Sequence, residues 1–275
     1  MRESNEAVPR RGILRAPAPD GLLDGRRMLP SAKLAAYVHH FWSVRWSLRT
    51  PFTGETLPHP SILIRHIDTR HRQRTELYGL QTGRLARTLT GEGELFGITF
   101  LPVMFQPLLR ASMASLTDRI VPLERVLGSK AKTWTRELHD ARTVDDKVAV
   151  TEAFLAPLLP PPAPRLTRLR DLVARIAADR SILGVEDISA LTGLDARALQ
   201  RRFQTYVGLS PKCVIQRYRL LEAAAQLAAP HPPSLATLAA SLGYADQAHF
   251  GRDFKRTVGQ TPSSFAAARS TTAHA

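Results

Sequence analysis

Residues 234–262 read SLATLAASLGYADQAHFGRDFKRTVGQTP, and this stretch predicts two short helices that meet at a tight turn. The first helix is apolar and ends at Gly243, because glycine tolerates the positive φ that such a turn requires. Asp246 is placed to cap the second helix, since its carboxylate accepts from free N–H groups one turn on. On that helix Phe250 and Phe254 share one inward face. This layout is typical of a helix-turn-helix, whose second helix enters the major groove of DNA.

A second unit of the same design lies upstream. Val185–Thr192 predicts its leading helix, Asp195 the cap of the following helix, and Leu199 and Phe203 the buried pair. A long helix from about Pro211 to Ala229 joins the two units and should span about 28 Å. Two recognition helices on one face of B-DNA should sit about 34 Å apart, which is one helical turn. The connecting helix therefore has the right order of length to set that spacing.

The end of the second unit carries a pattern in which a glycine turn, an aromatic pair and a Gly-Gln-Thr-Pro ending follow one another. Its members are Leu242-Gly243-Tyr244, Phe250, Arg252, Phe254-Lys255-Arg256 and Gly259-Gln260-Thr261-Pro262. On these residues the last part of the chain, about 100 residues, resembles the DNA-binding domain of AraC/XylS-type transcriptional regulators, which is two helix-turn-helix units joined by a long helix. One departure is that Ser189 and Thr192 stand where small apolar residues are usual, which predicts looser packing of the first unit.

The resemblance implies which side chains meet the DNA bases. In each unit they lie on the second helix, away from its buried aromatic or aliphatic side. They are Arg197, Gln200 and Arg201 in the first unit, and Gln247, Ala248, His249 and Arg252 in the second. Because Arg202 follows Arg201 directly, at least one of that pair is expected to contact phosphate or solvent instead of a base. For His249, an ordinary surface histidine is the competing interpretation.

Helix-Gly-helix corners also occur in all-α domains that never touch DNA, so one such unit would be a weak indication. Two in tandem, with the same cap and core layout, favour DNA binding. The net charge of +14 and the pI of about 10.9 also favour a polyanionic partner. Charge does not single out the C-terminal region, because residues 165–275 hold 15 Lys and Arg against 8 Asp and Glu, and residues 1–164 hold 23 against 16. We therefore expect double-stranded DNA as the partner, with RNA polymerase as a second candidate.

The chain has a single cysteine, Cys213, so no disulfide forms within it, which is consistent with a reducing compartment. A buried structural thiol is the favoured interpretation of Cys213, and a redox sensor is the alternative. No stretch approaches the roughly 18 apolar residues of a membrane span. No apolar segment follows the N-terminal arginines, as a secretory signal would need. We expect a cytoplasmic protein that does not bind membranes.

Composition divides the chain into four parts. Residues 1–28 mix Arg, Pro and Gly and are expected to be a poorly ordered tail. Residues 29–159 form an N-terminal sensor or dimerisation domain, residues 160–164 a Pro-rich linker, and residues 165–275 the DNA-binding domain. Before the linker, residues 143–159 alternate charged and apolar positions at helical spacing. The apolar face of this helix could pack on its own domain or on a second copy, so a homodimer is a hypothesis.

The predicted fold class is α+β, with a β-rich N-terminal sensor domain that also contains helices, followed by an all-α domain of two helix-turn-helix units. Aromatic and β-branched residues predict strands at residues 36–46, 61–67, 74–80 and 95–100. Turns are expected at residues 51–54 and 90–93, and helices from Pro102 onward. An N-terminal domain found on some AraC-type regulators is similar at residues 41–42, 57–64 and 97–102.

The function that follows is that of a one-component transcription regulator, which binds DNA sequence-specifically and whose N-terminal domain senses a small molecule or dimerises. The alternative is an N-terminal protein-interaction module without any ligand. An enclosed pocket lined by aromatic side chains such as Trp42, Trp46 or Phe100 would favour a sensor. An exposed apolar patch would favour an interaction module.

No motif indicates an enzyme, because the sequence has no nucleophile elbow, phosphate loop or paired-carboxylate pattern. The methyl-accepting DNA repair proteins that carry a similar C-terminal domain use a cluster of N-terminal cysteines, which this chain lacks. Histidines are frequent before residue 72, but His39 and His40 are adjacent and should point to opposite faces of a strand. We expect no catalytic residue, no metal and no cofactor.

Overall fold

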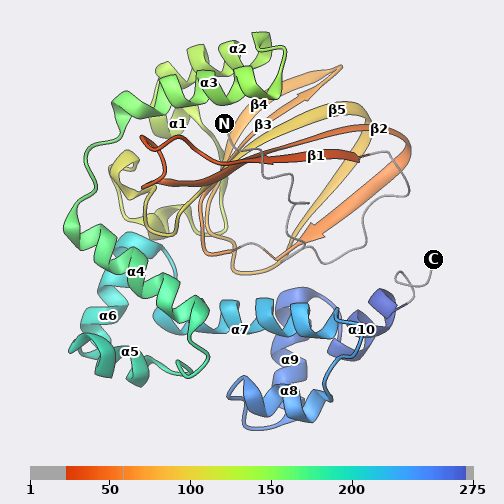
Figure 1. Ribbon diagram of the computed structural model, residues 1–275, viewed down its shortest axis with the longest axis vertical. Helices are drawn as coiled ribbons and strands as arrows, with labels where there is room; N and C mark the ends of the chain where they lie inside the picture. The colour runs from red at the N-terminus through yellow and green to blue at the C-terminus, as the bar shows by residue number, and fades with distance from the viewer. Residues whose placement is uncertain (1–22, 58, 271–275) are drawn as a thin grey trace.

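The computed structural model describes residues 23–57 and 59–270. Figure 1 shows a curved β-sheet in the N-terminal half, with helices across one side of it, and an all-helical C-terminal half below. The α+β fold class predicted from the sequence is confirmed. No helix in these two ranges is both long and apolar enough to cross a lipid bilayer.

The strands of the described ranges form one antiparallel sheet in the order β1-β2-β5-β3-β4-β6. Their bounds are β1 Leu23–Met28, β2 Val38–Thr56, β3 Leu63–Thr69, β4 Arg72–Tyr78, β5 Leu85–Phe100 and β6 Ile120–Pro122. Because side chains alternate along a strand, the sheet has two faces. We call one the helix face, defined by Phe41, Ile64, Leu77 and Ile98. The other is the tryptophan face, defined by Trp42, Trp46, Arg65, Ile67 and Leu95.

Strands β2 and β5 are much longer than the sequence predicts. The turns expected at residues 51–54 and 90–93 lie inside them, so that prediction is wrong. A register shift between Leu48 and Phe52 absorbs the extra residues of β2, and Gly91 on the opposite strand takes a φ of 55°. Such a bulge bends a strand and increases its twist without ending the pairing. The turn-forming residues therefore bend this hairpin instead of closing it.

The tail predicted for residues 1–28 also differs from the structure. Residues 1–22 lie outside the described ranges, whereas residues 23–28 form strand β1. This strand runs antiparallel to β2, with Met28 opposite Phe41. The outer edge of β2 offers unpaired N–H and C=O groups, and β1 satisfies them. The composition of residues 1–28 does not reveal that the edge of β2 needs a hydrogen-bonding partner, because β2 lies further along the chain.

The helix face is covered by α1 Glu124–Leu127, α2 Lys130–Asp140 and α3 Val144–Leu155, with 3₁₀ turns at Gln106–Leu108, Met113–Leu116 and Ala156–Leu158. Trp134 of α2 stacks on Phe154 of α3 with their ring centroids 4.7 Å apart. Leu138 and Leu155 are fully buried beside them. The apolar side of α3 therefore packs on its own domain. The homodimer hypothesis was based on this apolar side, which is not available to a second copy.

The C-terminal helices are α4 Pro164–Ala178, α5 Val185–Thr192, α6 Ala196–Arg202, α7 Pro211–Leu227, α8 Leu235–Ser241, α9 Gln247–Val258 and α10 Pro262–Ser270. One π-helical turn, Phe203–Val207, extends α6. Gly243, the turn residue predicted in the second unit, takes a φ of 76°, and Gly193, which ends α5 in the first unit, takes a φ of 67°. Both helix-turn-helix units are thus confirmed, and the connecting helix α7 ends two residues earlier than predicted.

Helix α7 crosses between the two units in Figure 1 and is joined to the first of them by a buried arginine. Arg219 is 2% exposed, and its Nη2 donates to the carbonyl oxygens of Ile176 at 2.9 Å, Asp179 at 2.5 Å and Ile182 at 3.3 Å. These acceptors belong to the last turn of α4 and the loop after it, where carbonyl groups lack intrahelical partners. Arg219 thereby fixes the first unit to α7.

Two residues earlier, Arg217 fixes the same helix to the N-terminal half. It is also 2% exposed, and its Nη2 donates to the carbonyl oxygen of Gln81, in the turn between β4 and β5, at 2.7 Å. The hydrophobic core is continuous as well, because one cluster runs from the sheet through α2 and α3 into the first helix-turn-helix unit. The Pro-rich segment 160–164 interrupts the helices but does not separate the cores.

We expect Arg219→Met to lower the free energy of unfolding by about 2–4 kcal/mol, because three buried carbonyl groups would lose their donor. Urea unfolding of the full chain, followed by circular dichroism, measures this change. Lys212→Met is the matched control, since Lys212 lies on the same helix and is exposed. We expect its effect to stay within about 0.5 kcal/mol. Equal losses for the two variants would contradict the role given to Arg219.

Candidate nucleic-acid interface

The recognition helix of the second unit, α9, begins where the sequence predicts. Oδ1 of Asp246 accepts from the backbone N–H of His249 at 2.6 Å, and this hydrogen bond holds the pKa of the Asp246 carboxyl below its usual value. Phe250 and Phe254 are fully buried, with ring centroids 5.6 Å apart. The side chains predicted to meet DNA are all exposed: Gln247, Ala248, His249 and Arg252. The cap and the aromatic pair therefore hold α9 with its predicted DNA-reading side open.

A polar anchor beneath α9 was missed by sequence reasoning. Asp253 is 6% exposed, accepts a hydrogen bond from Nε2 of Gln216 on α7, and pairs with Arg256 at 2.6 Å. The Nε2 atom of His249 lies 3.8 Å from the same carboxylate, and the His249 ring packs edge-on against Tyr244. His249 is thus held on one side, while 49% of its side chain stays exposed. No local pattern could reveal this anchor, because Gln216 and Asp253 are 37 residues apart.

The first unit presents its recognition helix in the same way. Oδ1 of Asp195 accepts from the backbone N–H of Ala198 at 2.7 Å, which caps α6. Leu199 and Phe203 are buried, as predicted. The predicted base-contacting side chains are exposed: Arg197, Gln200 and Arg201. Arg202 is exposed as well, so a phosphate contact is open to either member of the arginine pair.

The N-terminal half touches the C-terminal end of both recognition helices. Gly208 ends the first with a φ of 89°, and its carbonyl oxygen accepts from Oγ1 of Thr117 at 2.6 Å. Gly259 ends α9 with the same φ, and the Arg84 guanidinium lies so close that a Cβ on Gly259 would be 2.6 Å from it. Arg84 in turn pairs with Glu55 at 2.7 Å. Each recognition helix therefore contacts the N-terminal domain at the glycine that ends it, which is not one of the predicted base-contacting residues.

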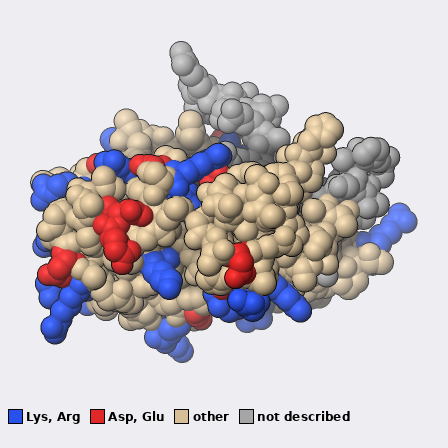
Figure 2. All heavy atoms as spheres, turned by 90° about the horizontal axis from the view of Figure 1, so that it is seen from below, with Lys and Arg blue, Asp and Glu red and all other residues tan. Residues whose placement is uncertain are grey.

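Charge by itself does not outline the interface. Figure 2 shows the molecule from below, where Lys and Arg form several separate groups with Asp and Glu between them. This agrees with the equal excess of basic residues in the two parts of the sequence. The candidate surface is therefore defined by the capped helices and their exposed side chains, not by one continuous basic patch.

Comparison with known proteins agrees with this geometry. A family described as a helix-turn-helix domain matches residues 188–268. The HTH-type transcriptional regulator RipA from Corynebacterium glutamicum is 32% identical over 133 residues, which is 48% of this chain and 39% of that protein. The C-terminal region is an AraC-type helix-turn-helix domain. The AraC-type domain is also similar to the regulator MtrA from Neisseria gonorrhoeae, at 32% identity over 81 residues, 30% of this chain and 27% of that protein. The chain thus covers less than half of the length of these curated relatives.

The part of the chain before the AraC-type domain matches a different family, a domain of unknown function named DUF6597, over residues 26–122. Among solved structures, a probable AraC family regulator from Rhodopseudomonas palustris is 29% identical and covers 36% of this chain and 94% of its own, with a TM-score of 0.33. ToxT from Vibrio cholerae is 11% identical and covers 90% of this chain and 98% of its own, with a TM-score of 0.44.

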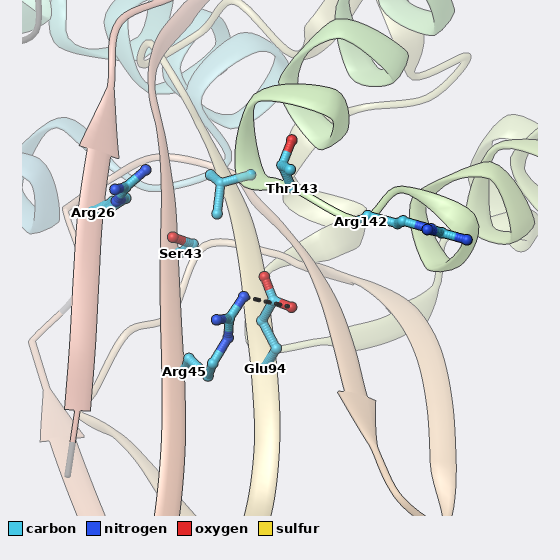
Figure 3. Close-up of a pocket in the computed structure, with 7 residues that line it drawn as sticks. Arg26, Ser43, Arg45, Glu94, Arg142 and Thr143 are labelled. Carbon is cyan, nitrogen blue, oxygen red and sulfur yellow. Dashed lines mark ion pairs between the residues drawn. The ribbon is translucent and has the colours of Figure 1, made fainter.

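A cavity of about 300 Å³ opens on the helix face beside the start of α3 (Figure 3). Its lining residues are Arg26, Ser43, Arg45, Glu94, Arg142, Thr143 and Val144. The one acid among them is already neutralised, because Glu94 pairs with Lys147 at 2.8 Å and with Arg45 at 3.9 Å. In Figure 3 the Arg142 side chain points away from Glu94. None of the aromatic side chains expected around an effector lines this cavity, since Trp42 and Trp46 lie on the tryptophan face and Phe100 is buried in the core.

The adjacent histidines are not arranged as predicted. A register shift between Val38 and His40 makes His39 the extra residue of a bulge, and the Nδ1 atoms of His39 and His40 lie 2.7 Å apart. Burial lowers the pKa of His39, and it lowers that of His40 to about 3, so both rings are neutral near pH 7. Within residues 23–57 and 59–270, no group of three or more His, Cys, Asp or Glu side chains could hold a metal ion.

We expect Asp195→Ala to lower the free energy of unfolding by about 1 kcal/mol, because the N–H of Ala198 would lose its acceptor at the start of α6. Asp195→Asn is the matched control, since the amide oxygen can still cap the helix. Urea unfolding of the two variants measures the difference. If the asparagine variant is destabilised as much as the alanine variant, capping is not what Asp195 contributes.

Proposed function

We propose that the chain regulates transcription by binding two successive major-groove segments of DNA, one with α6 and one with α9. The observation that carries this proposal is that both helices expose their predicted base-contacting side chains while their opposite sides are buried. Both are also tied to α7, whose 17 residues span about 25 Å. That length is of the same order as one turn of B-DNA, about 34 Å.

We also propose that the N-terminal domain regulates this binding in response to a small molecule. Its contacts at Gly208 and Gly259 reach both recognition helices, so a change in its conformation can alter their presentation together. The alternative, a protein-interaction module, should show a contiguous apolar patch. The exposed large hydrophobic side chains of the described ranges are instead scattered: Leu29, Ile120, Leu183 and Leu191. This scatter favours the sensor.

The direct test is selection of DNA sites from a genomic fragment library by the full chain, because the first helix-turn-helix unit shares its core with the N-terminal domain. We expect a site with two short motifs about one helical turn apart. Binding to the selected site and to unrelated DNA is then compared over a salt series. Equal binding to every sequence, lost together as salt rises, would overturn the proposal.

Single substitutions should separate the two motifs. We expect Arg201→Ala to relax preference in one motif and Arg252→Ala in the other, each at a cost of about 1–3 kcal/mol on the selected site. Arg136→Ala is the matched control, since Arg136 is an exposed arginine of α2. Electrophoretic mobility shifts on the selected site and on sites with either motif scrambled give the affinities. Weakening of the same size on all sequences would make the arginine a phosphate contact instead.

A further inference from the structure

Arg65 stands in the middle of the tryptophan face, in a row of residues that the pairing of four strands places side by side. Trp42, Gly97, Arg65 and Glu76 lie opposite one another across β2, β5, β3 and β4. Gly97 has no side chain, and the Trp42 indole fills the space, since a Cβ on Gly97 would lie 2.1 Å from the ring. The indole thereby reaches the Arg65 guanidinium, whose Cζ is 5.4 Å from its centroid.

The guanidinium of Arg65 is buried and has no polar partner among the residues that the structure describes. Arg65 is 8% exposed, and its guanidinium lies over the ring faces of Trp42 and Tyr78, with Cζ 5.4 and 4.4 Å from the two ring centroids. Within the described ranges it makes no hydrogen bond or ion pair, and its Nε is a buried donor without an acceptor. Buried charged groups are ordinarily paired, because leaving a donor unsatisfied costs free energy. The structure therefore contains a charged group that is oriented by its neighbours and not neutralised.

The nearest carboxylate is already occupied. Glu76 forms an ion pair with Arg74 at 3.2 Å and accepts hydrogen bonds from Nη2 of Arg87 and from the Tyr78 hydroxyl, each at 3.0 Å. Two guanidinium groups, those of Arg74 and Arg87, thus pair with this carboxylate, and the third, that of Arg65, lies beside them, which leaves an excess of positive charge on this part of the face. Burial, and then the charge of Arg87, lower the pKa of Arg65 to about 9, so its side chain is still charged near pH 7.

Apolar side chains surround this positive charge. Trp46, Ile67 and Leu95 are buried on the same face, and four further side chains that pack against them are half-buried: Trp42, Val44, Phe52 and Leu89. A bound molecule would therefore meet hydrocarbon and indole surface next to an unpaired guanidinium. Arginine pairs best with carboxylate and phosphate, which match its fork of donors. The apolar surroundings favour a single carboxylate with an apolar body over a highly hydrated phosphate.

We propose that the tryptophan face binds an amphipathic organic carboxylate, with the carboxylate on Arg65 and the apolar body against Trp42 and its half-buried neighbours. This inference rests on the proposed sensor function and names the chemical class of the effector. The cavity of Figure 3 lacks this combination, because none of its lining residues is aromatic and Val144 is the one apolar residue among them.

The test uses the full chain and four probes: benzoate and octanoate, and as matched controls benzylamine and octylamine, which carry the opposite charge on similar bodies. Thermal unfolding and calorimetric titration follow binding. We expect at least one of the two acids to raise the melting temperature and neither amine to do so. Failure of both acids to bind, or equal binding of acids and amines, would overturn the proposal without requiring any variant.

Substitution then locates the site. We expect Arg65→Gln to weaken binding of the acid by about tenfold or more, and Arg65→Lys, which keeps the charge, to weaken it less. Arg45→Gln is the matched control, since Arg45 lies on β2, points to the helix face and has a side chain that is 62% exposed. Undiminished binding in the Arg65 variants, or equal loss in the Arg45 variant, would place the acid elsewhere. Where Arg65→Gln does not fold, the lysine variant decides.

The outcome is distinguishable from failure of the proposed function. A chain that selects its DNA site but binds neither acid would overturn the inference about Arg65 and support the proposed DNA binding. A chain that binds an acid through Arg65 but shows no preference among DNA sequences would overturn the proposed DNA binding and support the inference about Arg65. Where both succeed, the affinity for the selected DNA with and without the acid shows whether the two sites are coupled.

Discussion

Two buried arginines on α7 donate to backbone carbonyl groups from different parts of the molecule, and the relative placement of those parts depends on these hydrogen bonds. Arg219 binds the end of α4 and the loop after it, and Arg217 binds the turn between β4 and β5. A guanidinium taken out of water costs several kcal/mol unless its donors find acceptors in a suitable geometry. The donors lie in one plane, so they accept few positions of their partners. One helix thereby becomes the common reference for the first helix-turn-helix unit and the sheet domain, and Gln216 adds the second unit through Asp253.

This arrangement links the two recognition helices to the rest of the chain. Two recognition helices can read one face of DNA only when their spacing is fixed, and α7 fixes it. The N-terminal domain contacts the same helices at Gly208 and Gly259, the glycines that follow their C-terminal ends. If the sheet domain moves, either the C-terminal ends of both helices move with it or these contacts break. The continuous core makes the first unit the more tightly coupled of the two.

The helix-turn-helix units were predicted well because their signals are local. The Asp195 and Asp246 caps and the glycine turns each act within a few residues, so a short stretch of sequence specifies them. The sheet was predicted less well, because its strands are defined by partners distant in the sequence. The turn residues at 51–54 and 90–93 are compatible with either a loop or a bulge. They form a bulge because β2 and β5 pair on both sides of them. Strand β1 exists because the edge of β2 needs a partner.

The sequence alone determined the α+β class, the two capped recognition helices and the exposed side chains on them, because helix periodicity and capping depend on near neighbours. Only the tertiary structure decided what lies beneath those helices and across the sheet. Asp253 meets Gln216, and Arg65 meets Trp42 over Gly97, only because folding brings together segments that are tens of residues apart. Strand register selects which side chains share a row, and a shift of one residue would turn Arg65 to the opposite face. Such positions are set by the packing of the whole chain, and so no pattern within a short stretch of sequence contains them.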